Sequence, residues 1–201
     1  MNRDFSNTVL SPLRESLRAI KRSEKQIATN WSIITGSPLS GKTTIIKKLE
    51  KLGYTIAPDF GRIALEEIIE SGKSKLAARA DYKALQQKIS DLQYEFLKNL
   101  DPRCFAFLDY GPPDNLAFLY YTSSISDRIL LERSTAFGFR HCYILDPLEL
   151  NDDADPVRIE QMDARIAIKE LSEDIYRCLD IPITHIPPTD VDTRLNLIRA
   201  K

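Results

Sequence analysis

The sequence lacks most of the features that mark specialised classes of protein. Its formal net charge is −1 over 201 residues, so no basic field indicates a nucleic-acid partner. No apolar run approaches the roughly 18–20 residues that a membrane-spanning helix needs. The N-terminus mixes charges and lacks the charged-then-apolar order of a signal peptide. These absences predict a cytoplasmic protein with no transmembrane segment, and they leave the oligomeric state open.

Cysteine and histidine are scarce as well. The chain has three cysteines, which are far apart in the sequence: Cys104, Cys142 and Cys178. Their odd number and wide spacing argue against a disulfide framework and against a Cys-x-x-Cys metal site. The two histidines, His141 and His185, stand alone. We therefore expect a reducing compartment.

Short apolar runs alternate with helical periodicities from Trp31 onward. The predicted strands are 31–35, 54–58, 104–110, 141–147 and 183–187. The predicted helices are 42–52, 60–71, 82–101, 112–121, 126–137, 156–179 and 191–200. This alternation predicts an α/β fold, a three-layer P-loop NTPase fold with a mainly parallel, about five-stranded sheet.

Residues 1–30 have a different pattern and are predicted to be an N-terminal helical extension of a domain that spans 31–201. The segment is a short amphipathic helix followed by a polar tail. Its basic residues are Arg14, Arg18, Lys21, Arg22 and Lys25. They fit a solvated helix face, and also a contact with a membrane surface or a partner.

Glycine is rare, with seven residues in the chain, and two of them frame one loop. The segment 36–43 reads GSPLSGKT and fits the phosphate-loop pattern G-x-x-x-x-G-K-[ST] at every position. It follows a predicted strand and opens a predicted helix, which is the context that this loop requires. The predicted nucleotide-binding residues are Gly36, Ser37, Pro38, Leu39, Ser40, Gly41, Lys42, Thr43 and Thr44.

The chemistry of polyphosphate binding explains this spacing. Glycines let the backbone curl so that successive N–H groups face one anion, and the helix N-terminus adds partial positive charge. Lys42 is expected to reach the β- and γ-phosphates, and the Thr43 hydroxyl to ligate Mg²⁺. We expect ATP as the nucleotide. GTP stays open, because the missing Asn-Lys-x-Asp motif excludes only the GTPase manner of reading guanine.

Acidic residues follow three of the predicted strands, where open α/β sheets bind their ligands. Asp109 comes after an apolar strand and is the expected magnesium-holding acid beside Thr43. Asp114 is a candidate for substrate binding, or a cap of the next helix. Asp146 precedes a proline and reads as a turn residue.

Asp59 is the candidate general base, or a substrate-binding residue, at the end of the second predicted strand. We expect this strand to lie beside the phosphate-loop strand, so that Asp59 faces the γ-phosphate across the acceptor pocket. The alternative is an N-cap, because a helix is predicted from Phe60. Arg62 is predicted to clamp an anionic substrate, or to lie exposed on the surface.

An acidic loop at 151–155 leads into a helix with three basic residues. Arg158, Arg165 and Lys169 share one face at i, i+7 and i+11. In small-molecule kinases such a lid closes over the nucleotide, and its arginines neutralise the transferring phosphoryl group. Arg158 is our catalytic candidate. The alternative is a solvated stripe paired with Asp163 and Glu173.

Taken in order, the segments TGSPLSGKTT, APDFGRIALEEI, FLDYGPPDNLAF, ILDPLELNDDADPVRIE and IPP resemble a family of P-loop ATPases and kinases. That family is typified by the ribosylnicotinamide kinase domain of NAD-biosynthesis regulators and by a protein involved in TRP-channel translocation. The resemblance covers Trp31 to the C-terminus. Family members usually carry Glu where Asp59 stands, and Asp-Arg-Gly where this chain has Asp109-Tyr110-Gly111.

Two functions follow from these residues. The first is transfer of a phosphoryl group from ATP-Mg²⁺ to a small hydroxyl-bearing metabolite such as a nucleoside. The second is an NTP-dependent switch or interaction module with slow hydrolysis and no small-molecule acceptor. Asp59 and Asp109 near the loop favour the first, while Tyr110 and the basic N-terminal segment favour the second.

Overall fold

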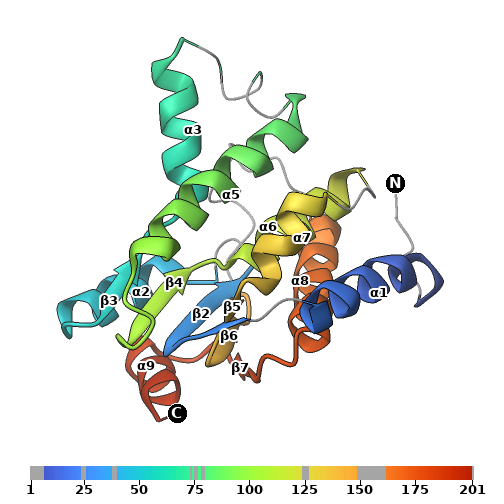
Figure 1. The fold of residues 1–201 in the computed structure, drawn as a ribbon. Coiled ribbons are helices and arrows are strands. Elements are labelled where there is room, and N and C mark those ends of the chain that lie inside the picture. The colour runs from blue at the N-terminus through green and yellow to red at the C-terminus, as the bar shows by residue number, and fades with distance from the viewer. Residues whose placement is uncertain are drawn as a thin grey trace.

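The structure, a computed structural model, describes residues 7–23, 26–37, 40–72, 74, 77, 80–123, 127–148 and 162–200 (Figure 1). The described helices are α1 (Asn7–Ser23), α2 (Lys42–Lys51), α3 (Phe60–Glu70), α5 (Tyr82–Asn99), α6 (Pro112–Ser123), α7 (Arg128–Thr135), α8 (Met162–Cys178) and α9 (Val191–Arg199). The described strands are β1 (Ile27–Ala28), β2 (Trp31–Gly36), β3 (Thr55–Ala57), β4 (Ala106–Asp109), β5 (Phe137–Gly138), β6 (His141–Leu145) and β7 (Ile183–Ile186).

The central sheet confirms the predicted fold class. It has five strands in the order β3-β4-β2-β6-β7, and every pair is parallel. Strand β2, the phosphate-loop strand, lies in the middle and is buried over residues 31–35. The carboxyl ends of all five strands therefore meet at the edge where the phosphate loop lies.

One expectation about strand order is wrong. Strand β3, which leads to Asp59, does not lie beside the phosphate-loop strand, because β4 is inserted between them. Asp109 at the end of β4 pairs in register with Ile34 of β2, so it is the acid nearest to the loop along the sheet. Chain order does not determine strand order in a parallel sheet, since each crossover helix can return to either side.

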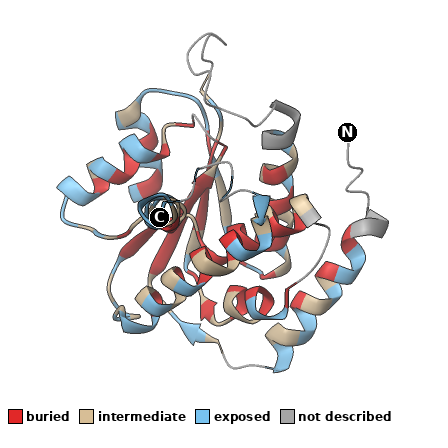
Figure 2. Cartoon of the chain, turned by 90° about the horizontal axis from the view of Figure 1, so that it is seen from above, coloured by how far each residue is buried: buried red, intermediate tan, exposed pale blue. Residues whose placement is uncertain are grey.

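Each face of the sheet has its own apolar core. Residues that alternate along β2 point to opposite faces, so Ile33 packs in one core and Ile34 in the other. Helices α2 and α9 cover the Ile34 face, and the other described helices pack on the Ile33 side. Figure 2 shows the buried strands between helices that turn exposed surface outward.

The helix expected within residues 1–30 is α1, and it packs on α7 and α8. Its leucines Leu10, Leu13 and Leu17 are buried in the same core as the sheet residues. Arg14 pairs with Asp174 of α8 at 2.8 Å. The division of the chain at residue 30 stays a prediction.

The predicted helix 126–137 extends too far. Helix α7 ends at Thr135, and Phe137–Gly138 form β5, which pairs in parallel with β1. Phe137 is buried, and its ring centroid lies 5.2 Å from that of Trp31. Burial of this ring and pairing with a distant strand outweigh the local helical pattern.

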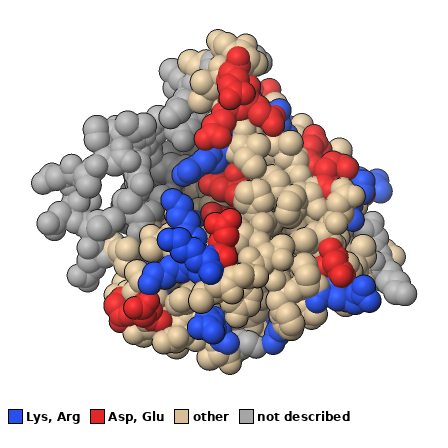
Figure 3. All heavy atoms as spheres, turned by 90° about the vertical axis from the view of Figure 1, so that its left-hand side faces the viewer, with Lys and Arg blue, Asp and Glu red and all other residues tan. Residues whose placement is uncertain are grey.

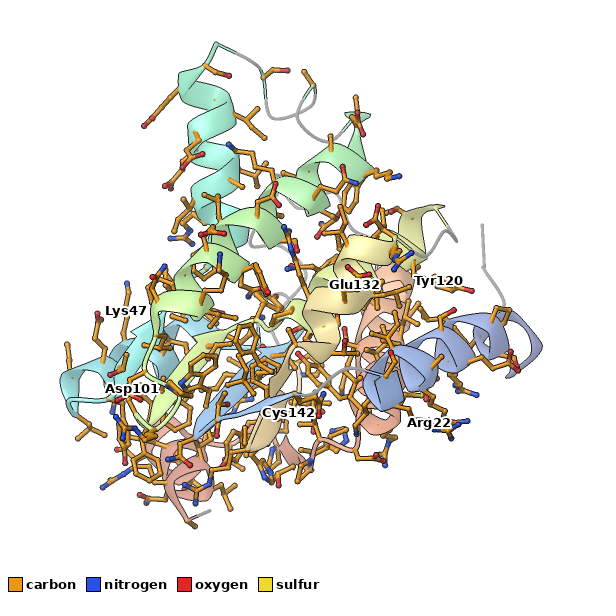
Figure 4. All side chains as sticks on the ribbon, in the orientation of Figure 1. Arg22, Lys47, Asp101, Tyr120, Glu132 and Cys142 are labelled. Carbon is orange, nitrogen blue, oxygen red and sulfur yellow. The ribbon has the colours of Figure 1, made fainter. Side chains whose placement is uncertain are left out.

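The cysteines are free, as expected, and Cys142 is buried within β6 (Figure 4). No described helix is long and apolar enough to cross a membrane.

Candidate functional site

The phosphate loop joins the end of β2 to the start of α2, and its two glycines have positive φ. Gly36 has φ 139°, and a Cβ there would lie 2.4 Å from the carbonyl oxygen of Leu145. Gly41 has φ 81° and is the N-cap of α2. A side chain at Gly36 would collide with the neighbouring strand end, so the close approach of loop and β6 requires glycine there.

The phosphate loop contains polar groups that have no hydrogen-bond partner among the described residues. No side chain caps α2, and the N–H groups of Thr44 and Ile45 both donate to the carbonyl oxygen of its N-cap, Gly41. The hydroxyls of Ser37 and Ser40 are buried and have no hydrogen-bond partner among the described residues. Unpaired buried polar groups are costly. Their concentration at a helix N-terminus fits an anionic ligand such as a polyphosphate.

Lys42 is buried, and its ammonium lies within the loop. Its Nζ donates to the carbonyl oxygens of Gly36 at 2.9 Å and Ser37 at 3.0 Å. It also lies 4.6 Å from the ring centroid of Tyr110, whose hydroxyl donates to Gly36 at 3.3 Å. The lysine is thus held at the loop, where a phosphate can replace the carbonyl contacts.

Tyr110 has an unusual backbone conformation for a bulky residue, with φ 65°. Its carbonyl accepts a hydrogen bond from Gln93 at 3.1 Å, and Asn115 donates to Gln93 at 2.8 Å. Gln93 and Asn115 are both buried. Strain of this kind persists only where surrounding contacts fix it, and it is frequent at functional sites. Here the amide pair fixes the Tyr110–Gly111 peptide.

Asp109 is buried at the end of β4, 8% exposed, and its Oδ1 has no hydrogen-bond partner among the described residues. Burial raises the pKa of this carboxyl to about 6. The charge of Asp59 also raises the pKa, while Lys42 and Arg62 lower it. A buried carboxylate with one oxygen unpaired among the described residues, beside a phosphate loop, fits a cation ligand.

Asp59 and Arg62 lie at the start of α3. Asp59 is the N-cap, and its Oδ1 accepts from the Arg62 N–H at 3.0 Å. The N-cap alternative is therefore the one that the geometry displays. Asp59 also lines the cavity described below, so its capping contact and a contact to a ligand are compatible. Arg62 is exposed and lines the same cavity.

Asp114 lies in the first turn of α6 and is fully engaged by protein groups. Its Oδ1 accepts from Thr35 at 2.9 Å, and its Oδ2 accepts from the Gly111 N–H at 2.8 Å and from Tyr176 at 2.5 Å. It is 1% exposed, and burial raises its pKa. These contacts favour the capping alternative, and a substrate contact at Asp114 stays an untested prediction.

A cavity of about 540 Å³ opens beside the strand ends. Helices α3, α5 and α6 form its walls, which include the aromatic rings of Phe60, Tyr82 and Phe118. Asp59, Arg62, Asp109 and Tyr110 also line it. Its wall also includes the amide of Gln86, which is buried and whose Oε1 has no partner among the described residues. On the face shown in Figure 3, acidic and basic side chains lie side by side around a hollow.

The structure describes only part of the predicted lid. Arg158 lies outside the described residues, as do Pro38 and Leu39 of the loop, and the side chain of Arg165 is not described. Lys169 pairs with Asp146 at 2.5 Å. The partner of Lys169 is therefore neither of the two acids, Asp163 and Glu173, that were expected to pair with this helix face.

Glu173, one of the two acids expected to pair with the basic helix face, contacts Arg177 and His185 instead. Its contact with Arg177 is the salt bridge expected at i, i+4 within one helix.

Within the described ranges, no three His, Cys, Asp or Glu side chains form a cluster that could hold a metal ion. A magnesium ion here would need nucleotide oxygens to complete its shell, as P-loop proteins provide.

Sequence reasoning missed Gln86, Gln93, Asn115 and Arg194. The first three are polar residues on buried helix faces, which is a detectable signal, since buried polar groups need partners. Arg194 of α9 is buried under the loop, and its Nη1 donates to the carbonyl of Ser40 at 2.6 Å.

Comparison with solved structures finds deoxyadenosine kinase from M. mycoides. The form with dCMP and a flexible dCDP bound has a TM-score of 0.56 at 16% identity, covering 85% of this chain and 96% of that chain. The form with dCTP bound has a TM-score of 0.54 at 17% identity, covering 85% and 97%. At these identities the likeness is one of fold. A search of curated proteins gives no match.

A family model described as an AAA domain matches residues 31–194, from the first residue of the phosphate-loop strand to the arginine beneath the loop. The match spans most of the chain and includes every described residue of the site above. The chain therefore belongs to this AAA-domain family.

Proposed function

We propose that the protein is an ATP- and Mg²⁺-dependent kinase that transfers a phosphoryl group to a hydroxyl of a small nucleoside-like acceptor. The observation that carries the proposal is the cavity of about 540 Å³ that Asp59 and Asp109 line. A nucleotide-binding switch needs the loop but has no need of a second pocket beside it. A kinase needs both, because donor and acceptor must meet at the γ-phosphate.

The roles of the residues follow from their positions. Lys42 and the N–H groups at the start of α2 bind the phosphates, and Thr43 with Asp109 would hold Mg²⁺. Asp59 lies in the cavity wall and would orient the acceptor hydroxyl and take its proton. Arg62, exposed at the cavity rim, would bind an anionic group of the acceptor.

The walls of the cavity indicate a flat, aromatic acceptor. Phe60, Tyr82 and Phe118 offer ring surfaces, and aromatic side chains pack well against planar groups. The amide of Gln86 adds an unpaired hydrogen-bonding group to the wall, which suits a nucleobase edge. The deoxyadenosine kinase that shares the fold, and the resemblance to ribosylnicotinamide kinases, make nucleosides and ribosylnicotinamide the first acceptors to test.

The experiment is a screen for transfer from γ-labelled ATP to these acceptors, followed by Asp59→Asn with the best one. Asparagine is also a good N-cap, so the helix start should persist while the base is lost. We expect ATP affinity to stay nearly unchanged and transfer to fall by roughly 10²-fold or more.

Asp81→Asn is the matched control. Asp81 caps α5 through a hydrogen bond of 3.0 Å from the Ala84 N–H, as Asp59 caps α3, but it does not line the cavity. Equal transfer rates in the two variants would remove Asp59 from the mechanism. If no acceptor is labelled while ATP is bound and slowly hydrolysed, the switch function takes its place.

A further inference from the structure

Arg194 lies beneath the phosphate loop, on the side of the sheet covered by α2 and α9. It is 2% exposed, one of the largest fully buried side chains in the described part of the chain. Its Nη1 donates to the carbonyl of Ser40 at 2.6 Å, and its Nη2 donates to the carbonyl of Asp146 at 3.0 Å. Nη2 also lies 3.4 Å from the carbonyl oxygen of Ile186. One guanidinium thus joins the loop to the ends of β6 and β7.

Burying the charged guanidinium of Arg194 costs free energy, because the charge loses its contact with water. Burial lowers the pKa of Arg194, and the charge of Asp146 raises it. The Asp146 carboxylate is engaged by Lys169, however, and no described residue accepts from Nε of Arg194. An apolar side chain of similar volume would often stabilise a core as well or better. The cation is therefore better explained by what it does to the loop.

The contact of Arg194 with the Ser40 carbonyl fixes the orientation of the Ser40–Gly41 peptide. A trans peptide is planar, so the C=O of Ser40 and the N–H of Gly41 point in opposite directions. The Ser40 carbonyl points to Arg194, so the Gly41 N–H points away from Arg194. Among the described residues, none accepts a backbone hydrogen bond from Gly41. A Cβ on Gly41 would lie 3.1 Å from Nη1, so the arginine also restricts this position to a small residue.

We propose that Arg194 is a positioning residue, which orients the Ser40–Gly41 peptide so that the Gly41 N–H faces the phosphates of the nucleotide. The proposal rests on the proposed function only in that the loop binds a polyphosphate. It adds that the last described helix, α9, controls the donor geometry of the loop. The positive charge behind the loop acts in the same direction, because it favours an anion on the other side.

The first measurement is the affinity for inorganic tripolyphosphate and for ATP, by isothermal titration. Arg194→Met keeps volume in the core and removes the three carbonyl contacts. We expect both affinities to fall by roughly tenfold to a hundredfold, the usual effect of losing charge-assisted hydrogen bonds. Arg199→Met is the matched control, because Arg199 is an exposed arginine of the same helix, and it should bind both ligands as the wild type does.

The second measurement reports on the peptide itself. Only Ser40–Gly41 and Ser71–Gly72 are Ser-Gly pairs in the sequence. Cell-free labelling with ¹³C-carbonyl serine and ¹⁵N-glycine therefore leaves two amide signals selected through the carbonyl. Gly72 lies at the end of α3 and donates to Ile69 at 2.9 Å, so it serves as an internal reference. In the wild type, tripolyphosphate should shift the Gly41 amide and leave Gly72 in place.

In Arg194→Met, the Gly41 amide should be displaced before any ligand is added and should respond less to tripolyphosphate. The proposal is overturned if Arg194→Met binds tripolyphosphate as tightly as the wild type with the same Gly41 shift, whatever happens to its melting temperature. If Arg194→Met does not fold, Arg194→Lys provides the test. The ammonium of lysine is one point donor and cannot reproduce the two separate nitrogens, Nη1 and Nη2, that reach these carbonyls. A smaller loss of affinity with a displaced Gly41 amide is therefore expected, and unchanged affinity and shift overturn the proposal.

Failure of the proposed function would look different. A wild type that binds tripolyphosphate with a Gly41 shift but labels no acceptor contradicts the kinase and supports the role of Arg194. A wild type in which tripolyphosphate leaves the Gly41 amide unmoved contradicts the role of Arg194 directly.

Discussion

Asp109→Asn should stabilise the ligand-free protein, and the gain should depend on pH. The pKa of Asp109 is about 6 in the folded protein, against an ordinary value of 3.8. The folded state therefore keeps a proton that the unfolded state releases between these values, so stability falls as the pH rises from about 4 to 6 and stays low above. At 1.36 kcal/mol per unit, the ionised carboxylate costs roughly 3 kcal/mol at pH 8. At pH 5 about half of that cost remains.

The assay is urea unfolding of wild type and Asp109→Asn at pH 8 and pH 5, without nucleotide or metal. We expect Asp109→Asn to be the more stable protein at pH 8, by up to roughly 3 kcal/mol. The difference should shrink to about half at pH 5. The asparagine amide makes its own hydrogen-bonding demands in a buried site, so the figure of roughly 3 kcal/mol is an upper limit for the measured gain.

Asp127→Asn is the control, because Asp127 is equally buried at 8% exposed. Burial raises its pKa, but hydrogen bonds from the Leu130 N–H and the Gln87 amide lower it to a net value below the ordinary one. Its carboxylate is satisfied, so Asp127→Asn should destabilise at pH 8. A loss of stability in Asp109→Asn at pH 8, or a gain that does not change with pH, would refute the account of Asp109 as a carboxylate held for a cation.

For binding of ATP with Mg²⁺, we expect the wild type to exceed Asp109→Asn, which is the opposite of their expected order in stability. In the wild type, the extra affinity for ATP that Mg²⁺ gives should grow as the pH rises through about 6, because the cation requires the ionised carboxylate. In Asp109→Asn this extra affinity should be small at every pH, while ATP binding without metal persists. Titrations with and without Mg²⁺ at pH 5 and pH 8 measure both effects.

Two further substitutions test the nucleotide side of the site. Lys42→Ala removes the buried ammonium, so ATP affinity should fall by roughly tenfold to a hundredfold with the fold retained; an unchanged affinity in isothermal titration contradicts the loop assignment. Arg158→Ala should lower turnover more than ATP affinity, since a lid arginine acts mainly on the transition state; equal losses in both would mark it as a plain binding residue.

The phosphate loop could be predicted from the sequence because its signal is local. Glycine at positions 36 and 41 and lysine at 42 are fixed by the geometry of a single turn, and the adjoining strand and helix are readable by periodicity. Asp109 was predicted for a similar reason, as an acid that directly follows a buried strand.

Contacts between distant segments could not be predicted in this way. Arg194 reaches Ser40 across 154 positions of sequence, and strand β1 finds β5 at Phe137. In a single sequence nothing distinguishes Arg194 from the exposed Arg199 of the same helix except its place on an apolar face. The order of the strands was mispredicted at β3 because either side of the sheet is open to a crossover connection.

For Asp59, the sequence presents two roles as alternatives, and the structure shows that they are compatible. From the pattern, the residue was either the N-cap of a helix or a group for the substrate. A carboxylate has two oxygens, and the N-cap uses Oδ1 alone, with the Arg62 N–H as donor. No described residue donates to Oδ2, and the residue lines the cavity. The helix thus holds the carboxylate at one oxygen and leaves the other for the proposed contact with the acceptor hydroxyl. Capping and catalysis therefore need not compete at this position, and Asp59→Asn separates them because asparagine preserves only the first.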